Sequence, residues 1–149
     1  MIQRIQSVYL LVVTILLIVC MCTPVGAYIA EDYSVSKFTN LCIVSADGVK
    51  YAPWAMFIIL VVAALLSFTT IFMFKKRMLQ IRMTIFSTIL LVGYYATLIT
   101  FIFMLKDDSM TFSASWTLCL PFVAIILNWL AIRAIGKDEV LVKAYDRLR

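Results

Sequence analysis

The chain has 149 residues, of which 64% are hydrophobic and only 14% are charged. A soluble domain is nearer half apolar and a quarter charged, so this composition excludes an ordinary water-soluble protein. The net charge of +5 does not indicate nucleic-acid binding, because the charges lie in short segments between apolar runs. Histidine is absent, which removes the usual general base near neutral pH and the commonest metal ligand. We therefore expect no metal site and no other cofactor.

Four apolar runs follow one another, at 7–27, 53–74, 83–105 and 116–135. Each is about as long as the roughly 20 residues that cross the bilayer hydrocarbon as a helix. The two central runs contain no charged residue and are apolar on every face, as is typical of helices surrounded by lipid. We therefore predict a single all-α membrane domain, 1–149, folded as a bundle of four transmembrane helices. Pro121 is expected to kink or locally unwind the outer end of the fourth helix.

The first run has two interpretations. A basic start at Arg4, an apolar core and the small residues Val25-Gly26-Ala27 are also typical of a secretory signal peptide. A retained first span is favoured because three more spans follow and because the charge distribution agrees with it.

Residues 28–52 form the only substantial polar stretch, an outer loop in this scheme. Asp47-Gly48 between β-prone residues is a strong hairpin signal, because both central positions of such a turn need positive φ. The sequence predicts strands at 41–45 and 49–51, with a third strand within 28–35 and an irregular loop as the alternative. The fold prediction thus adds a small extracytoplasmic β-hairpin between the first and second helices.

Positive charge sets the predicted orientation. One group of segments contains ten cations: Arg4, Lys75, Lys76, Arg77, Arg82, Arg133, Lys137, Lys143, Arg147 and Arg149. The other group contains three: Lys37, Lys50 and Lys106. Because cytoplasmic loops are enriched in Lys and Arg, both termini and the basic turn at 75–82 are predicted to be cytoplasmic.

The tail, 136–149, differs from the spans. Val140, Leu141, Tyr145 and Leu148 recur at helical spacing among charged residues. This pattern predicts a short amphipathic helix on the cytoplasmic membrane surface. A solvated helix end that frays is the alternative, and the sequence leaves both open.

Few polar side chains lie within the spans. Asn128 is the strongly polar one at depth and shares a helix face with Ala124 and Ala131. Small residues on the third run, Gly93, Ala96, Thr97 and Thr100, and Ala63 with Ser67 on the second, predict faces that meet in the interior. Tyr94 and Tyr95 are adjacent, so only one points inward, and either would supply the hydroxyl that Asn128 needs. The candidate interior polar contacts are Asn128, Tyr94, Tyr95, Thr97 and Thr100.

Catalytic groups are scarce. The absence of ionisable residues at mid-depth argues against a proton-coupled transporter and an intramembrane protease. The cysteines Cys20, Cys22, Cys42 and Cys119 all fall toward the outer side, as in quinone-linked thiol oxidoreductases. Cys20 and Cys22 nevertheless point about 200° apart on a helix, so they cannot form a Cys-x-x-Cys couple. A disulfide involving Cys42 stays open.

The two ends of the chain, MIQRIQSVYL and RAIGKDEVLVKAYDRLR, resemble a family of small four-span inner-membrane proteins of Bacteroidetes that is known only as a domain of unknown function. The resemblance covers essentially the whole chain. It implies a bacterial cytoplasmic-membrane location and the four-span fold, and it assigns no reaction and no site.

From these patterns we predict a non-enzymatic accessory or assembly subunit that binds another membrane protein within the lipid bilayer. Homo-oligomerisation stays open. The candidate partner surface comprises Lys75, Lys76, Arg77, Lys137, Asp138, Glu139, Asp146 and Arg147. The first alternative is a transporter or channel for a neutral or lipophilic solute, and the second is a quinone-linked thiol oxidoreductase.

Overall fold

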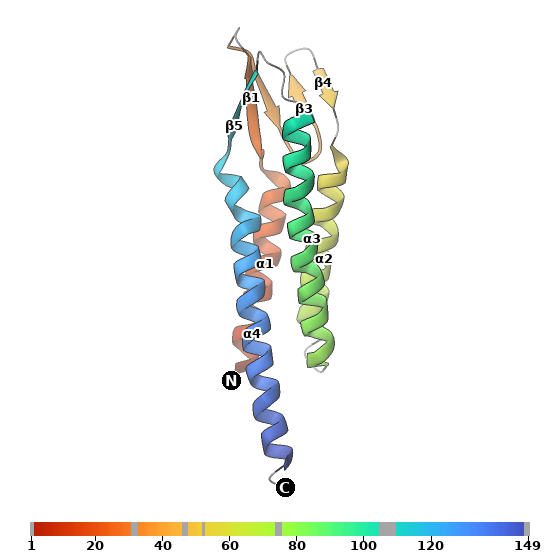
Figure 1. The fold of residues 1–149 in the computed structure, drawn as a ribbon, viewed down its shortest axis with the longest axis vertical. Coiled ribbons are helices and arrows are strands. Elements are labelled where there is room, and N and C mark those ends of the chain that lie inside the picture. Colours follow the sequence, from red (N-terminus) through yellow and green to blue (C-terminus); the bar gives the residue numbers. More distant parts are fainter. Residues whose placement is uncertain are drawn as a thin grey trace.

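The computed structural model describes residues 2–30, 33–45, 48–51, 53–73, 76–104 and 110–147. Over these residues it contains four long helices: α1 (Ile2–Cys22), α2 (Trp54–Phe72), α3 (Arg77–Met104) and α4 (Cys119–Arg147). Each is long and apolar enough to cross a membrane, which is the composition of a multi-pass membrane protein. Figure 1 shows the helices side by side with a sheet at one end, called the sheet end below. Both chain termini lie at the opposite end, called the terminal end.

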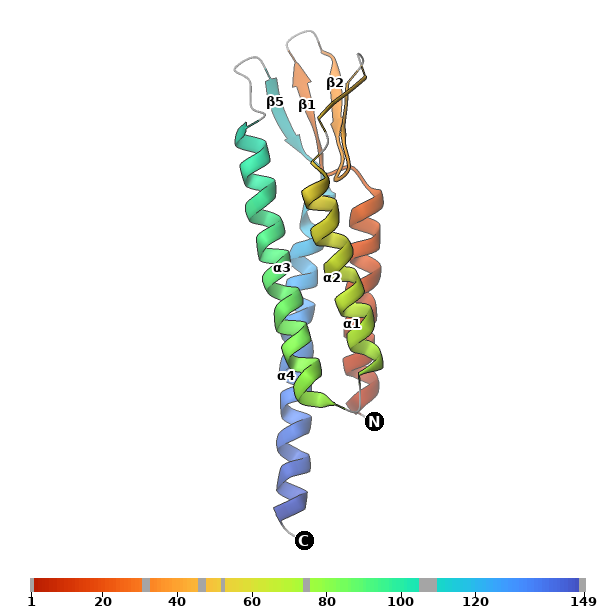
Figure 2. The same cartoon turned by 90° about the vertical axis from the view of Figure 1, so that its right-hand side faces the viewer.

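The helices pack as an up-and-down bundle. Helix α1 contacts α2 and α4, and α3 contacts the same two helices (Figure 2). The side chains of Leu17, Leu60, Leu91 and Ala124 are buried between them. Large apolar side chains on the outer faces are exposed, as expected where lipid rather than water surrounds the bundle.

The sheet end carries an antiparallel sheet of five strands in the described residues, in the order β4-β3-β2-β1-β5. The strands are β1 (Gly26–Ala30), β2 (Val35–Phe38), β3 (Ile43–Ser45), β4 (Gly48–Tyr51) and β5 (Met110–Ala114). The hairpin of β3 and β4 is confirmed. Gly48 has a positive φ of 116°, but it pairs with Ser45 as the first residue of β4, so it is not the central turn residue that the sequence predicts.

The sheet contains more strands than the hairpin that the sequence predicts. Two strands, β1 and β2, occupy the region where one was expected. Strand β5 lies in the segment expected to be a plain loop, and it pairs with β1 from Gly26↔Ala114 to Ala30↔Met110. An isolated two-stranded hairpin is marginally stable, so these added strands supply the pairing it lacked. The fold is therefore mainly helical with a five-stranded cap.

Several helix boundaries also differ from the predicted spans. Helix α1 ends at Cys22, because the chain enters β1 at Gly26. Helix α3 begins at Arg77, so most of the basic segment 75–82, predicted to be a loop, forms the start of this helix. The predicted tail is the last part of α4 rather than a separate surface helix. Pro121 lies in the first turn of α4, where its missing N–H costs no helical hydrogen bond, and a 3-10 turn at Trp116–Leu118 precedes it.

Three aromatic rings join the sheet to the bundle. Tyr28 lies 5.9 Å from Phe38 and 5.1 Å from Phe112 between ring centroids. Tyr28 and Phe38 belong to the same buried apolar cluster as the helix residues Leu17 and Tyr94. The inner face of the sheet therefore closes the bundle instead of standing apart from it.

The Tyr28 hydroxyl is buried and has no hydrogen-bond partner among the described residues, and burial raises the pKa of this side chain. The folded protein thus holds this proton more tightly than the unfolded chain does. The free energy of unfolding therefore keeps its full value below pH ~10, the usual tyrosine pKa, and falls as the pH rises above it. We expect Tyr28→Phe to be somewhat more stable than the wild type at pH 7, because the orphan hydroxyl is removed, and to lose less stability above pH ~10. Unfolding midpoints in detergent from pH 7 to 11 measure this. Equal slopes for the two proteins would contradict it.

Candidate functional site at the terminal end

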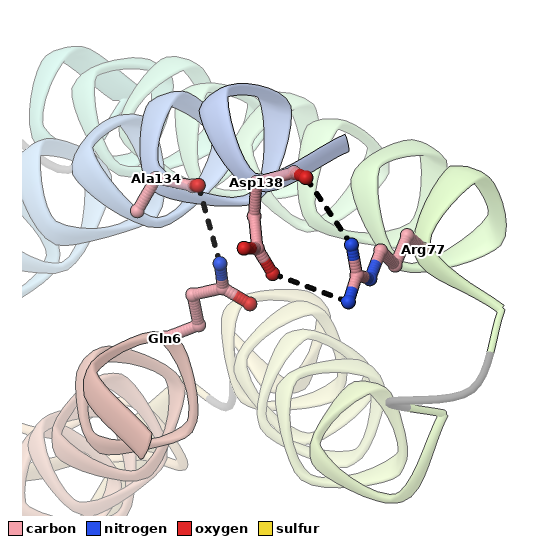
Figure 3. Close-up of polar contacts among 4 residues, drawn as sticks. All are labelled: Gln6, Arg77, Ala134 and Asp138. Carbon is pink, nitrogen blue, oxygen red and sulfur yellow. Dashed lines mark hydrogen bonds and ion pairs between the residues drawn. The ribbon is translucent and has the colours of Figure 1, made fainter. Parts of the chain in front are cut away.

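The terminal end is fastened by polar contacts onto α4 (Figure 3). On α1, Gln6 is almost fully buried, and its Nε2 donates a hydrogen bond of 3.1 Å to the carbonyl oxygen of Ala134. A buried amide needs such a partner because an unpaired one would cost free energy. This contact holds the start of α1 against α4 at Ala134.

Arg77, at the start of α3, makes a second contact with α4. Its Nη1 donates a hydrogen bond of 3.2 Å to the Asp138 carbonyl oxygen, and its Nη2 lies 3.4 Å from Asp138 Oδ2 (Figure 3). The contact between Nη2 and Oδ2 does not have hydrogen-bond geometry, so it is an ion pair without a hydrogen bond. The guanidinium thus engages both the backbone and the side chain of one residue, where α4 leaves the bundle.

We expect Asp138→Asn to lower the free energy of unfolding by about 1–2 kcal/mol, because the ion pair is largely buried. It should also loosen the end of α4, which amide hydrogen exchange over 139–147 measures. The control is Glu139→Gln, which removes a carboxylate 2.9 Å from the exposed Lys143 ammonium. An exposed pair contributes less, about 0.5 kcal/mol. Equal effects of the two variants would show that Arg77 does not hold α4.

Beyond this contact α4 continues alone. Figure 1 shows its last turns extending past the ends of the other helices. Three large apolar side chains on this extension are more than half exposed, namely Val140 by 67%, Leu141 by 53% and Tyr145 by 79%, beside Val142 at 44%. We call these three residues the α4 patch. At 100° per residue, Leu141 and Tyr145 lie on the opposite side of the helix from Glu139 and Lys143.

The α4 patch continues into a groove between α1 and α4. The groove has a volume of about 570 Å³, and its lining includes Ile5, Tyr9, Leu130 and Leu141. Arg133 and Lys137 flank it, and the Arg133 guanidinium lies 5.4 Å from the Trp129 ring. An apolar strip bordered by cations therefore runs from the bundle onto the extension.

A separate polar cluster lies at the sheet end. The Tyr94 hydroxyl donates a hydrogen bond of 2.8 Å to Asn40 Oδ1, and Asn40 Nδ2 donates one of 2.7 Å to the Cys20 carbonyl oxygen. Asn40 is fully buried and joins the loop after β2 to α1 and α3. The Tyr95 hydroxyl donates to the Leu118 carbonyl oxygen at 2.6 Å. The expectation that one of these tyrosines serves Asn128 is therefore wrong.

Asn128 is fully buried with Ala124 and Ala131, on the face predicted from the sequence. Among the described residues, neither Oδ1 nor Nδ2 has a hydrogen-bond partner. Both tyrosine hydroxyls are engaged some turns away, toward the sheet end. The amide thus carries an uncompensated desolvation cost within α4.

We expect Asn128→Leu, which keeps the branching of the side chain, to raise the free energy of unfolding by about 1–2 kcal/mol because the orphan amide is removed. Unfolding in detergent mixtures measures this, with Asn40→Leu as the control that removes a fully bonded amide and destabilises the protein. A loss of stability in Asn128→Leu would show that the amide has a partner in the folded protein, such as an enclosed water molecule.

The interior face of α3 differs from the predicted one. Its buried residues are Gln80, Thr84, Ser87, Leu91, Tyr94 and Leu98. Thr97 is half-buried and Thr100 is exposed, and both hydroxyls donate to carbonyl oxygens of their own helix. Ser67 is buried as expected, and its hydroxyl lies 3.3 Å from that of Ser87. Of the four candidate interior polar contacts on α3, Tyr94 is therefore the buried one.

The four cysteines are unpaired. Cys20 is buried, whereas Cys22 and Cys119 are exposed, in agreement with the opposite directions expected for Cys20 and Cys22. The Cys42 thiol lies 3.6 Å from the Thr39 hydroxyl. Among the described residues, no group of three or more His, Cys, Asp or Glu side chains is placed to hold a metal ion.

The candidate partner surface is only partly described. Lys76 and Lys137 are exposed, while Arg77 and Asp138 bind each other. Lys75 and the side chains of Asp146 and Arg147 lie outside the described residues. Gln6 was not predicted, although an amide at the border of an apolar run is a usable signal. Asn40 was not predicted either, because it lies within the polar stretch 28–52, where an amide is ordinary. The exposed apolar residues of α4 were seen in the sequence, but not as a projecting surface.

A family model described as a domain of unknown function, DUF4293, matches residues 2–148, so the chain belongs to this family. No curated protein matches the sequence at a significant level.

Proposed function

We propose that this member of the DUF4293 family is a non-enzymatic accessory protein of a Bacteroidetes cytoplasmic membrane that binds another membrane protein through the α4 patch. In this proposal both termini face the cytoplasm, as the ten-to-three distribution of cations favours. The observation that carries the proposal is the exposure of Val140, Leu141 and Tyr145 on a helix that extends past its own bundle.

Length supports the position of this surface. About 20 helical residues cross the hydrocarbon layer, and counting from Cys119 they end near Asp138. Residues 139–147 would then project about 13 Å farther, into the headgroups and the water beyond. Large exposed apolar side chains are favourable inside lipid but not there, so a partner that covers them would gain free energy.

The contacts at the exit point favour a binding role. Asp138, held by Arg77, fixes the direction of the extension before any partner arrives. A helix that is already ordered loses little conformational entropy on binding. The groove beside Leu141, with Ile5 and Tyr9 on α1, would receive an apolar helix of the partner.

Photocrosslinking in the native membrane tests this proposal. A photoreactive residue in place of Tyr145 should give one discrete adduct with a second membrane protein. The matched control carries the same group in place of Lys143, on the opposite side of the extension, and should give little or none. Leu141→Glu should abolish the Tyr145 adduct while the protein still inserts and folds.

Each other result counts against the proposal. An adduct with the mass of two copies would show that the patch joins identical chains. Equal labelling from both positions would indicate random collisions. Labelling of lipid alone from position 145 would mean that the patch lies in the bilayer and binds no protein.

A further inference from the structure

A second groove lies on the other side of α4, against the start of α3. It has a volume of about 760 Å³. Four cations line it, Lys76, Arg77, Arg82 and Lys143, together with one acid, Glu139. The rest of its wall is apolar, formed by Met78, Leu79 and Val142. A groove with this lining favours an anionic ligand that also has an apolar part.

Two of the four cations are compensated within the chain. Arg77 lies against Asp138, and the Lys143 ammonium is 2.9 Å from a Glu139 carboxylate oxygen. Lys76 and Arg82 are exposed, and within the described part of the chain neither takes part in an ion pair. Positive charge is therefore left over in the groove, beside the first turn of α3, where the helix dipole also favours an anion.

The separation of Lys76 and Arg82 along the chain is close to the thickness of the lipid headgroup layer. Arg82 follows Lys76 by six positions, which is about 9 Å along the chain at helical rise. The polar layer on each side of a bilayer is roughly 5–8 Å thick. Residues 83–104 of α3 carry no charge, so Arg82 lies nearer the hydrocarbon and Lys76 lies nearer the water.

We propose that this groove binds the phosphate of an anionic phospholipid, with Lys76 and Arg82 as its main partners. Met78, Leu79 and Val142 would contact the glycerol and the ester ends of the acyl chains of the same lipid. This apolar wall favours a lipid over free inorganic phosphate, which has nothing to place against it. The site is distinct from the α4 patch and does not depend on a protein partner.

Binding of single lipids to the delipidated full-length protein, followed by native mass spectrometry, tests the site. We expect phosphatidylglycerol to be retained more strongly than phosphatidylcholine. The double variant Lys76→Gln/Arg82→Gln should weaken phosphatidylglycerol binding about 30-fold, because each cation near anionic lipid contributes about five-fold. The matched control, Arg133→Gln/Lys137→Gln, removes the same charge beside the other groove and should change binding less than three-fold.

Every other outcome overturns the proposal. Equal losses in the two double variants would mean that net charge, not this groove, attracts the lipid. Equal retention of both lipids would mean that no phosphate charge is recognised beyond the zwitterionic headgroup. Displacement of bound phosphatidylglycerol by millimolar inorganic phosphate would assign the site to the free ion. Thermal unfolding of both double variants without lipid checks that each remains folded.

Discussion

Replacing Asn40 by alanine is expected to lower the free energy of unfolding by about 3–4 kcal/mol, the largest effect of any polar substitution considered. The side chain is fully buried and makes two hydrogen bonds, to the Tyr94 hydroxyl and to the Cys20 carbonyl oxygen. Its loss would leave both partners buried and unsatisfied. The Cys20 carbonyl lies in the last turn of α1, where no helical N–H is available to it.

Unfolding in mixed detergents measures this change, and Tyr94→Phe separates the two hydrogen bonds. The Phe variant loses only the donor to Asn40 Oδ1, so we expect about 1 kcal/mol. In a double-mutant cycle the two substitutions should couple by about 1 kcal/mol. Thr100→Ala, at an exposed position, is the matched control with little effect. A loss under 1 kcal/mol in Asn40→Ala would show that the cluster does not hold the sheet end together.

Substitution of Gly26 by alanine should lower the free energy of unfolding by about 2–4 kcal/mol, because overpacking forces backbone to move. A Cβ at this position would lie 2.6 Å from the Phe112 ring and 2.8 Å from the Ser113 carbonyl oxygen. The ring is itself packed against Tyr28 and Phe38, and the carbonyl belongs to β5. Relief of the clash would therefore separate β1 from β5.

Gly93→Ala is the matched control for Gly26→Ala. A Cβ at Gly93 meets nothing within 4 Å, and the residue lies within α3. Because alanine is the better helix former, this variant should gain about 0.5–1 kcal/mol. Hydrogen exchange over 110–114 should rise in the Gly26 variant alone. Equal stability of the Gly26 variant and the wild type would mean that β5 adapts without cost.

The two glycines also show where reasoning from the sequence is weakest. Gly93, Ala96, Thr97 and Thr100 were expected to face the interior because small residues allow helices to approach closely. The structure buries Ser87 and Tyr94 on α3 instead. In a helix surrounded by lipid, the outer face is as apolar as the inner one, so hydrophobicity does not identify the buried face. The spacing of Gln80, Thr84 and Ser87 was the better signal.

Other features depend on residues far apart in the chain. Arg77 and Asp138 are 61 positions apart, and β1 joins β5 across most of the chain. No local pattern predicts which distant segments will pair. The tail from residue 136 was expected to be separate from the fourth span, yet α4 continues through Gly136 to Arg147, with Asp138 held by Arg77.

The sequence by itself determined four helices long and apolar enough to cross a membrane, because length and uninterrupted apolarity are local properties of each segment. It also indicated the hairpin of β3 and β4, because Gly48 readily adopts the positive φ found where β4 begins. Only the tertiary structure decided which faces meet, that Asn40 and not Asn128 binds Tyr94, and that the end of α4 stands beyond the bundle. The physical reason is that hydrogen bonds and packing between distant segments depend on their positions in space, which no short stretch of sequence specifies.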